Sequence, residues 1–152
     1  TPVSFALLLN LVAVANPEDK SQLWGFISQY APEASPEKNR LLDELAGYAM
    51  SYYQDFVLPQ KTYRAPTDKE RAAMEDLSAR LKAFDGEPTS ENLQTLTFSV
   101  GKEHEFENLR EWFQALYEVL LGQSQGPRFG SFAALYGVAN TARLMDEALA
   151  RD

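Results

Sequence analysis

The chain has 152 residues, of which 45% are hydrophobic and none is cysteine, and its formal net charge is −8. This length supports one hydrophobic core, so we expect a single domain over residues 1–152. The absence of cysteine excludes disulfide frameworks and thiolate metal sites, and together with a start unlike a signal peptide it predicts a cytoplasmic protein. The acidic balance argues against general nucleic-acid binding, because phosphates attract Lys and Arg, so any such site must be local.

Three helix signals occur in the first half of the chain. An apolar run over residues 3–15 predicts a buried helix, because it is shorter than the roughly 20 apolar residues that a membrane span needs. Asn16-Pro17 predicts the N-cap and first position of a second helix over about 17–30. A similar start at Ser35-Pro36 predicts a long helix that ends at Pro59. Its expected apolar face consists of Leu41, Leu45, Tyr48, Ala49, Tyr52 and Phe56.

Five further helices are expected in the second half, and capping signals mark the first three of them. Thr67 and Glu70 fit a capping box, Thr89 or Ser90 fits an N-cap, and so does Asn108 or Glu107. The five helices are expected at about 67–84, 89–104, 107–122, 131–136 and 141–150. Because no strand alternation or hairpin is convincing, the sequence predicts an all-α fold, a compact bundle of about seven to eight helices joined by short loops.

Catalytic chemistry is scarce in this sequence. His104 is the one histidine, so a multi-histidine metal site is excluded. It is flanked by Lys102, Glu103 and Glu105 rather than by a nucleophile motif, and no glycine-rich nucleotide-binding pattern occurs. We therefore expect no catalytic residue, no metal site and no cofactor in this chain.

Two stretches without acidic residues interrupt the acidic pattern, namely residues 56–67 and residues 119–145. Within the second, the loop from Gly122 to Phe132 combines three glycines, one proline, two aromatic residues and Arg128. This composition suits contact with a polyanion that carries stackable rings. Acid-free runs of this length also occur in ordinary loops, and that alternative stays open.

A set of motifs runs along nearly the whole chain. In chain order the motifs are Val3-Ser-Phe-Ala-Leu-Leu-Leu-Asn10, Tyr52-Tyr-Gln-Asp-Phe56, Lys61 with Tyr63-Arg64, Lys102-Glu-His104, Glu111-Trp112-Phe113-Gln-Ala-Leu-Tyr117, Leu120-Leu-Gly122 and Gly126-Pro127-Arg128-Phe129-Gly130-Ser131-Phe132. The specific part is a helix containing Trp and Phe, followed by Leu-Leu-Gly and Gly-Pro-Arg-Phe-Gly. Together these motifs resemble the C-terminal region of class I lysyl-tRNA synthetases.

The resemblance implies a fold and a function. In that family this region is the all-helical anticodon-binding domain, related to the α-helical cage of bacterial glutamyl-tRNA synthetases, and it reads the uridine-rich anticodon of lysine tRNA. Lysine activation with ATP belongs to an N-terminal Rossmann domain, whose HIGH-like and KMSKS-like signatures are absent here. The partners expected are therefore the anticodon stem-loop of lysine tRNA and the catalytic domain of the same polypeptide, with no DNA and no membrane.

Candidate RNA-binding residues follow from the side chains that hold anticodon bases and phosphates. The first is Arg128, because the glycines around it let the backbone approach a ligand; its alternative role is to cap the helix that contains Trp112. Phe129 and Phe132 would stack on bases, with packing in the core as the alternative. The other candidates, for which ordinary surface roles are the alternative, are Lys102 and His104 before the Trp112 helix, and Lys61, Tyr63 and Arg64 between Pro59 and Pro66.

Three functions from different classes stay open at this point. The first is anticodon recognition as part of a synthetase whose aminoacylation takes place in another domain. The second is a helical protein-interaction module whose acidic face meets a basic partner. The third is a freestanding relative that acts on tRNA in another way.

Overall fold

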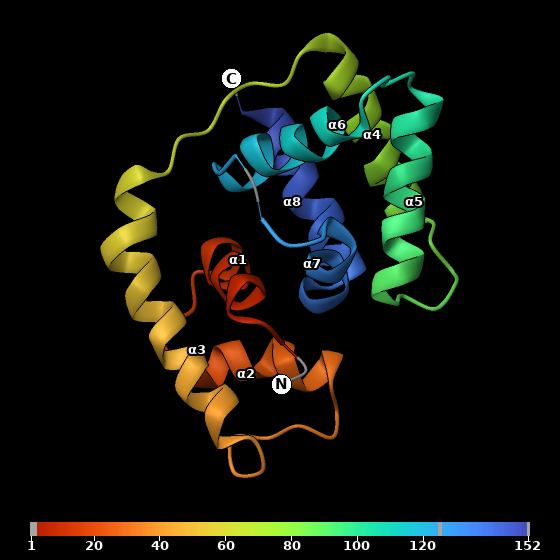
Figure 1. Cartoon of the computed structure of the whole chain (residues 1–152). Coiled ribbons are helices and arrows are strands. Elements are labelled where there is room, and N and C mark those ends of the chain that lie inside the picture. The colour runs from red at the N-terminus through yellow and green to blue at the C-terminus, as the bar shows by residue number, and fades with distance from the viewer. Residues whose placement is uncertain (1–2, 125, 152) are drawn as a thin grey trace. The chain divides into compact units, whose positions relative to one another are not determined.

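The computed structural model describes residues 3–124 and 126–151 (Figure 1), and within these residues it contains eight α-helices and no strand. The predicted all-α fold is therefore confirmed. The chain divides into two compact units, which meet between Lys61 and Thr62 in the sequence. The expectation of a single domain over residues 1–152 stays a prediction. No helix in the described part of the chain is long and apolar enough to cross a membrane.

Three helices form the first unit, and α1 and α2 both pack against α3. Their bounds are Phe5–Ala15 for α1, Lys20–Tyr30 for α2 and Arg40–Tyr52 for α3, which continues through a π-helical turn at Tyr53–Val57 and a 3-10 turn at Leu58–Gln60. The fully buried side chains at the centre are Leu8, Leu11, Leu23, Ile27 and Leu42. The indole of Trp24 donates a 2.9 Å hydrogen bond to Asp43, which also pairs with Lys20.

The start of the second helix corrects one sequence-based expectation. Asn16 does not begin α2; it ends α1 in the left-handed conformation (φ 47°), and its N–H donates to the Val12 carbonyl. The N-cap of α2 is Asp19, whose carboxylate accepts from the Gln22 N–H. Asn is a good residue for either role, because it tolerates positive φ at helix ends as well as capping helix starts.

The long helix buries a different face from the expected one. Its buried residues are Leu42, Ala46, Ala49 and Tyr53, whereas Leu41, Tyr48 and Phe56 stay exposed by 62%, 66% and 60%. The sequence holds two apolar rows one residue apart, and both keep helical spacing. The row that faces α1 contains two alanines, whose small side chains let helix backbones approach closely. Only Ala49 belongs to both the expected and the observed face.

Five helices form the second unit, in which α4 packs against α8 and α5 against α7 (Figure 1). Their bounds are Asp68–Lys82 for α4, Ser90–Glu103 for α5, Leu109–Leu116 for α6, Phe129–Tyr136 for α7 and Val138–Ala150 for α8. A π-helical turn at Tyr117–Leu121 extends α6. The predicted caps at Thr67, Thr89 and Asn108 are confirmed, and Thr67 and Glu70 form a complete capping box.

Trp112 of α6 and Gly130 of α7 both pack closely against α5 in the second unit. Trp112 is fully buried, and its indole donates a 2.9 Å hydrogen bond to the Thr97 carbonyl inside α5. On α7, a Cβ at Gly130 would lie 2.4 Å from the Ser90 carbonyl oxygen, so only glycine permits the observed contact with α5. The Gly130 N–H also donates a 2.7 Å hydrogen bond to the Gln94 side chain. These contacts fix the start of α7 against α5.

Candidate functional site

The two acid-free stretches meet in the second unit. The N–H of Thr62 donates a 3.1 Å hydrogen bond to the carbonyl of Gly122, the residue that ends the π-helical turn in the left-handed conformation (φ 70°). The segment 62–66 therefore lies against the start of the loop that carries Arg128. Sequence reasoning treated these two stretches as separate candidates without choosing between them, and the structure brings their near ends together.

Arg128 occupies the N-cap position of α7 and is exposed. Its carbonyl accepts from the N–H groups of Ser131 and Phe132. Among the described residues no hydrogen bond or ion pair joins its guanidinium to another group, so the alternative role as a cap of the Trp112 helix is not what the structure shows. Instead, Arg151 donates to the Val119 carbonyl within the π-helical turn that extends that helix.

The two phenylalanines after Arg128 lie in the core of the second unit. Phe129 and Phe132 are 1% and 0% exposed, with ring centroids 5.9 Å apart, and Phe129 also meets the Tyr117 ring edge to face. Neither ring has a face open to a base, so the expected stacking role is corrected to core packing. The reason is the early start of α7 at Phe129, which turns both side chains inward at an i, i+3 spacing.

Arg64 is held by two carboxylates of the same unit. Its guanidinium lies 2.7 Å from Glu70 and 2.7 Å from Glu118, and it also donates to the Ala65 carbonyl. Burial alone would raise the pKa of Glu70, but hydrogen bonds from Arg64 and from the Thr67 backbone hold that pKa below its ordinary value. Four of the five guanidinium N–H groups are used in this way, so Arg64 ties the segment to α4 and to the π-helical turn after α6 rather than offering its charge to a ligand.

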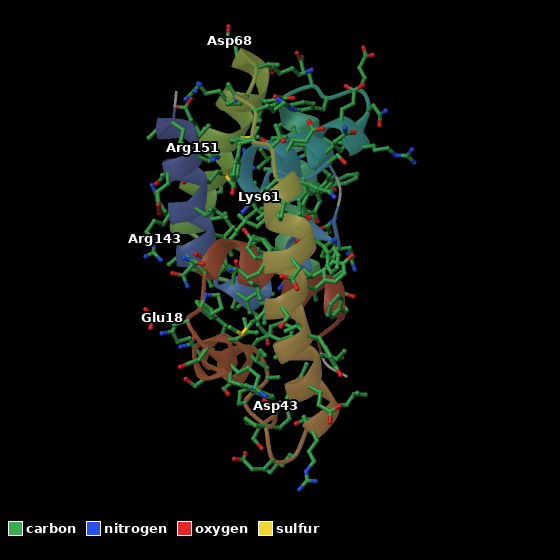
Figure 2. The ribbon with its side chains drawn as sticks, turned by 90° about the vertical axis from the view of Figure 1, so that its left-hand side faces the viewer. Glu18, Asp43, Lys61, Asp68, Arg143 and Arg151 are labelled. Atoms are coloured by element: carbon green, nitrogen blue, oxygen red, sulfur yellow. The ribbon has the colours of Figure 1, made fainter. Side chains whose placement is uncertain are left out.

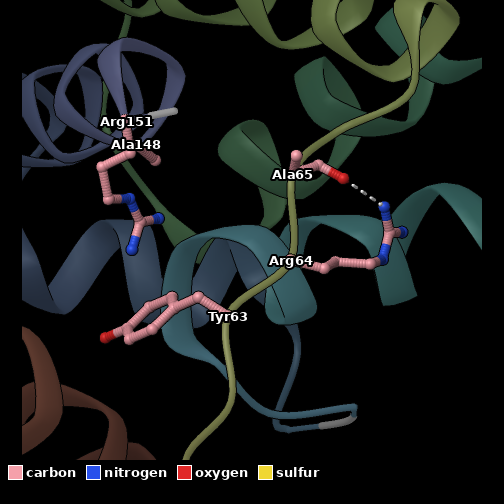
Figure 3. Close-up of a pocket in the computed structure, with 5 residues that line it drawn as sticks. All are labelled: Tyr63, Arg64, Ala65, Ala148 and Arg151. Carbon is pink, nitrogen blue, oxygen red and sulfur yellow. Dashed lines mark hydrogen bonds between the residues drawn. The ribbon is translucent and has the colours of Figure 1, made fainter.

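On the other side of the same segment, Tyr63 faces the end of α8 (Figure 3). The guanidinium carbon of Arg151 lies 4.2 Å from the centroid of the Tyr63 ring, at cation–π distance. A pocket of about 250 Å³ opens between the segment and α8, and Arg64, Ala65 and Ala148 complete its lining. Figure 3 shows that Arg64 extends away from Tyr63 and Arg151.

Sequence reasoning missed Arg151. It stands beside acidic residues at the end of the chain, outside both acid-free stretches. One signal could have found it, because an arginine directly after the last helical residue is well placed to donate to free carbonyls. Its carbonyl partner nevertheless belongs to a turn 32 residues earlier, which no local pattern reveals.

Lys102 and His104 lie at the C-terminal end of α5, in a different network. The ammonium of Lys102 lies 5.4 Å from the Phe98 ring centroid. His104 is the C-cap residue of α5, and its Nε2 lies 2.8 Å from Asp76 Oδ2. Burial opposes ionisation of Asp76, but His104 and Arg80 together hold its pKa below the ordinary value. His104 is therefore half-buried and engaged by a carboxylate.

An open pocket of about 630 Å³ adjoins His104, and it is lined otherwise by Lys69, Glu105, Phe106 and Glu107. The ammonium of Lys69 lies 4.5 Å from the Phe106 ring centroid and donates to the Glu105 carbonyl. Two carboxylates at this rim repel phosphate, so the pocket suits an RNA backbone less well than the pocket beside Arg151 does. Lys61 belongs to the first unit, where its ammonium contacts the Tyr53 hydroxyl at 2.9 Å.

Three curated relatives show what the chain is similar to. It is 57% identical over 148 residues to a lysine–tRNA ligase of Roseobacter denitrificans, a match that covers 97% of this chain and 28% of the relative. It is 46% identical over 147 residues to a lysine–tRNA ligase of Rickettsia bellii, and this match covers 97% of the chain and 28% of the relative. A lysine–tRNA ligase of Rickettsia felis is 44% identical over 144 residues, which are 95% of the chain and 27% of the relative. No family model and no solved structure matches the chain.

The chain spans little more than a quarter of the length of these relatives, so it is homologous to one segment of lysine–tRNA ligases. The part of the sequence-based resemblance that points to lysyl-tRNA synthetases is thereby confirmed. Its assignment to class I and to the anticodon-binding domain stays a prediction.

Proposed function

We propose that this chain is the anticodon-binding segment of a class I lysyl-tRNA synthetase and that it recognises the anticodon of lysine tRNA. The observation that carries the proposal is the match, at 57% identity over 97% of the chain, to a protein named lysine–tRNA ligase. The all-helical fold agrees with the α-helical anticodon-binding domain that the sequence resemblance implies. Joining lysine to tRNA with ATP is then the work of a catalytic domain of the same polypeptide, in the cytoplasm.

The charge distribution of the second unit supports a local RNA contact. Many cations of this unit are paired, as Arg64 is with Glu70 and Arg80 is with Glu103. Arg128 is exposed without an ion pair to another described residue, next to a loop rich in glycine. A guanidinium of this kind is available to a phosphate or to a base edge, whereas a paired one has to break an existing bond first. This explains how a chain of net charge −8 can bind RNA at one place.

A second candidate function, contact with protein, is favoured by the first unit. Leu41, Tyr48 and Phe56 form an exposed apolar row along α3 and the turn that follows it. Rows of this kind are typical of surfaces that meet another protein surface. The two functions are compatible, because a segment of a synthetase has to contact RNA through one surface and the rest of its polypeptide through another.

Binding of RNA stem-loops tests the proposal directly. We expect this chain to bind the anticodon stem-loop of lysine tRNA more tightly than the same stem-loop with an unrelated anticodon. Log affinity should fall with log salt by about 0.7 for each phosphate contacted in the single-stranded loop. Arg128→Ala should weaken binding, whereas Arg110→Ala, which removes an exposed arginine at the start of α6, serves as the matched control. Equal affinity for both anticodons would contradict the proposal.

A further inference from the structure

We infer that the pocket between segment 62–66 and the end of α8 holds one unpaired nucleobase, stacked against Tyr63 and Arg151. This inference rests on the proposed function and adds the place at which a base is read. The sequence analysis named Tyr63 as a candidate but did not name Arg151, which stands beyond the last helix.

The size of the pocket fits a single planar group. It measures about 250 Å³, just below the range of roughly 300–1,000 Å³ that is usual for drug-sized ligands. A second pocket of about 320 Å³ shares Tyr63, Ala148 and Arg151 with it, and adds Leu120, Leu144 and Glu147. The pair of pockets therefore offers one space for a base and an adjoining space for the sugar attached to it.

The Arg151 guanidinium already lies against the Tyr63 ring, so the base stacks on this pair rather than between its members, and neighbouring contacts hold both residues in place. The segment is held before Tyr63 by the hydrogen bond from Thr62 to Gly122, and after it by the ion pairs of Arg64. The end of α8 is held by Arg71, which donates a 2.9 Å hydrogen bond to the Leu149 carbonyl. Because these contacts order the walls without a ligand, a base entering the pocket does not have to pay for that order.

The lining matches the chemistry of a base. Bases bind to single-strand readers by stacking on aromatic rings or on guanidinium planes, and Tyr63 is 43% exposed at the pocket. Arg151 donates one N–H to Val119, so its other N–H groups can reach a base acceptor or a phosphate oxygen.

Arg143 provides a matched arginine on the same helix. Figure 2 shows Arg143 within α8 and Arg151 just beyond its end. Arg143 bonds to Asn140 and lies 3.8 Å from Glu147, but it does not line either pocket. Its removal takes the same charge from α8, eight residues before Arg151, and leaves Tyr63 and Arg151 in place.

The experiment combines protein variants with abasic RNA. Each anticodon-loop base of the lysine stem-loop is replaced in turn by an abasic nucleotide, and the Kd is measured for each RNA. With the unaltered chain we expect one position at which loss of the base weakens binding by about tenfold. For Tyr63→Ala, the same abasic replacement should not weaken RNA binding any further. For Tyr63→Phe and Arg143→Ala, it should still weaken binding by about tenfold. Arg151→Lys should lose most of it, because lysine keeps the charge but lacks the planar surface.

The outcomes separate the two proposals. If Tyr63→Ala keeps the full abasic effect at every position while the unaltered chain still discriminates between anticodons, the pocket is overturned and anticodon recognition stands. If the unaltered chain does not discriminate between anticodons, the proposed function itself fails. Thermal unfolding of each variant shows whether the fold is intact, and Tyr30→Ala, at a half-buried tyrosine at the end of α2, reports the effect of losing a tyrosine elsewhere.

Discussion

The two units of this chain differ in which large side chains they leave exposed to solvent. The second unit buries its largest aromatic side chains and ties its exposed elements with ion pairs, such as the bridge from Arg64 to Glu70 and Glu118. The first unit leaves a row of large apolar side chains on α3 open, although it has a buried core of its own. The difference teaches that helical periodicity alone does not tell a core face from a contact face, because both rows of α3 keep the same spacing.

The largest expected effect tests which row of α3 holds the first unit together. Leu42→Ala removes a fully buried side chain and should cost about 3 kcal/mol of unfolding free energy, because it leaves a cavity beside α1. Leu41→Ala, one residue away on the exposed row, should change stability by no more than about 0.5 kcal/mol. Urea unfolding followed by Trp24 fluorescence, in a Trp112→Phe background, measures both. Equal effects would mean that both rows contribute to the core.

A somewhat smaller effect tests the close packing of the second unit. In Gly130→Ala the new Cβ would meet backbone atoms of α5, namely the Ser90 oxygen at 2.4 Å and the Gln94 nitrogen at 2.6 Å. We expect a loss of about 2 kcal/mol, because the backbones must move apart. Gly25→Ala in α2 is the control; nothing lies within 4 Å of its Cβ, so better helix propensity should stabilise the chain by up to about 1 kcal/mol. Urea midpoints compare the two, and unchanged stability in Gly130→Ala would contradict the tight contact.

The ion pairs of the second unit predict how its stability depends on pH. The pKa of Glu70 is lower in the folded chain than in the unfolded one, so the folded state binds its proton less readily. Its contribution is therefore present above the unfolded value of about 4 and is lost as the pH falls through the folded pKa. Glu70→Gln should flatten the fall of the urea midpoint between pH 7 and pH 3. Glu44→Gln, at an exposed position of α3, should leave the profile of the original chain; identical profiles for both variants would exclude the Arg64 bridge as the cause.

The smallest expected effect concerns a polar atom inside the second unit. The hydroxyl of Tyr117 is buried and has no hydrogen-bond partner among the described residues, and burial raises the pKa of this phenol. Tyr117→Phe should therefore keep the stability or increase it by up to about 1 kcal/mol, because a buried group without a partner costs desolvation energy. Thermal unfolding checks the sign. A clear loss of stability would show that the hydroxyl has a partner, such as a bound water.

Much of the fold could be predicted because helix signals are local. Thr67, Thr89 and Asn108 cap their helices as predicted, since each cap bonds to a backbone N–H within the next three residues. The fold class followed from such signals together with apolar spacing. The candidate site was less predictable. Residue type shows that Arg64 can bind a phosphate and that Phe132 can stack on a base, but not that Arg64 is paired with carboxylates and Phe132 is buried in the core.

The sequence by itself determined the helical class, the helix starts at Thr67, Thr89 and Asn108, and the resemblance to lysyl-tRNA synthetases, since all of these depend on residues close together in the chain. Only the tertiary structure decided which row of α3 is buried, that Arg64 is paired and that Arg151 meets Tyr63. Each of those outcomes depends on which distant segments the fold brings into contact; Glu118 lies 54 residues from Arg64, and Val119 lies 32 residues from Arg151.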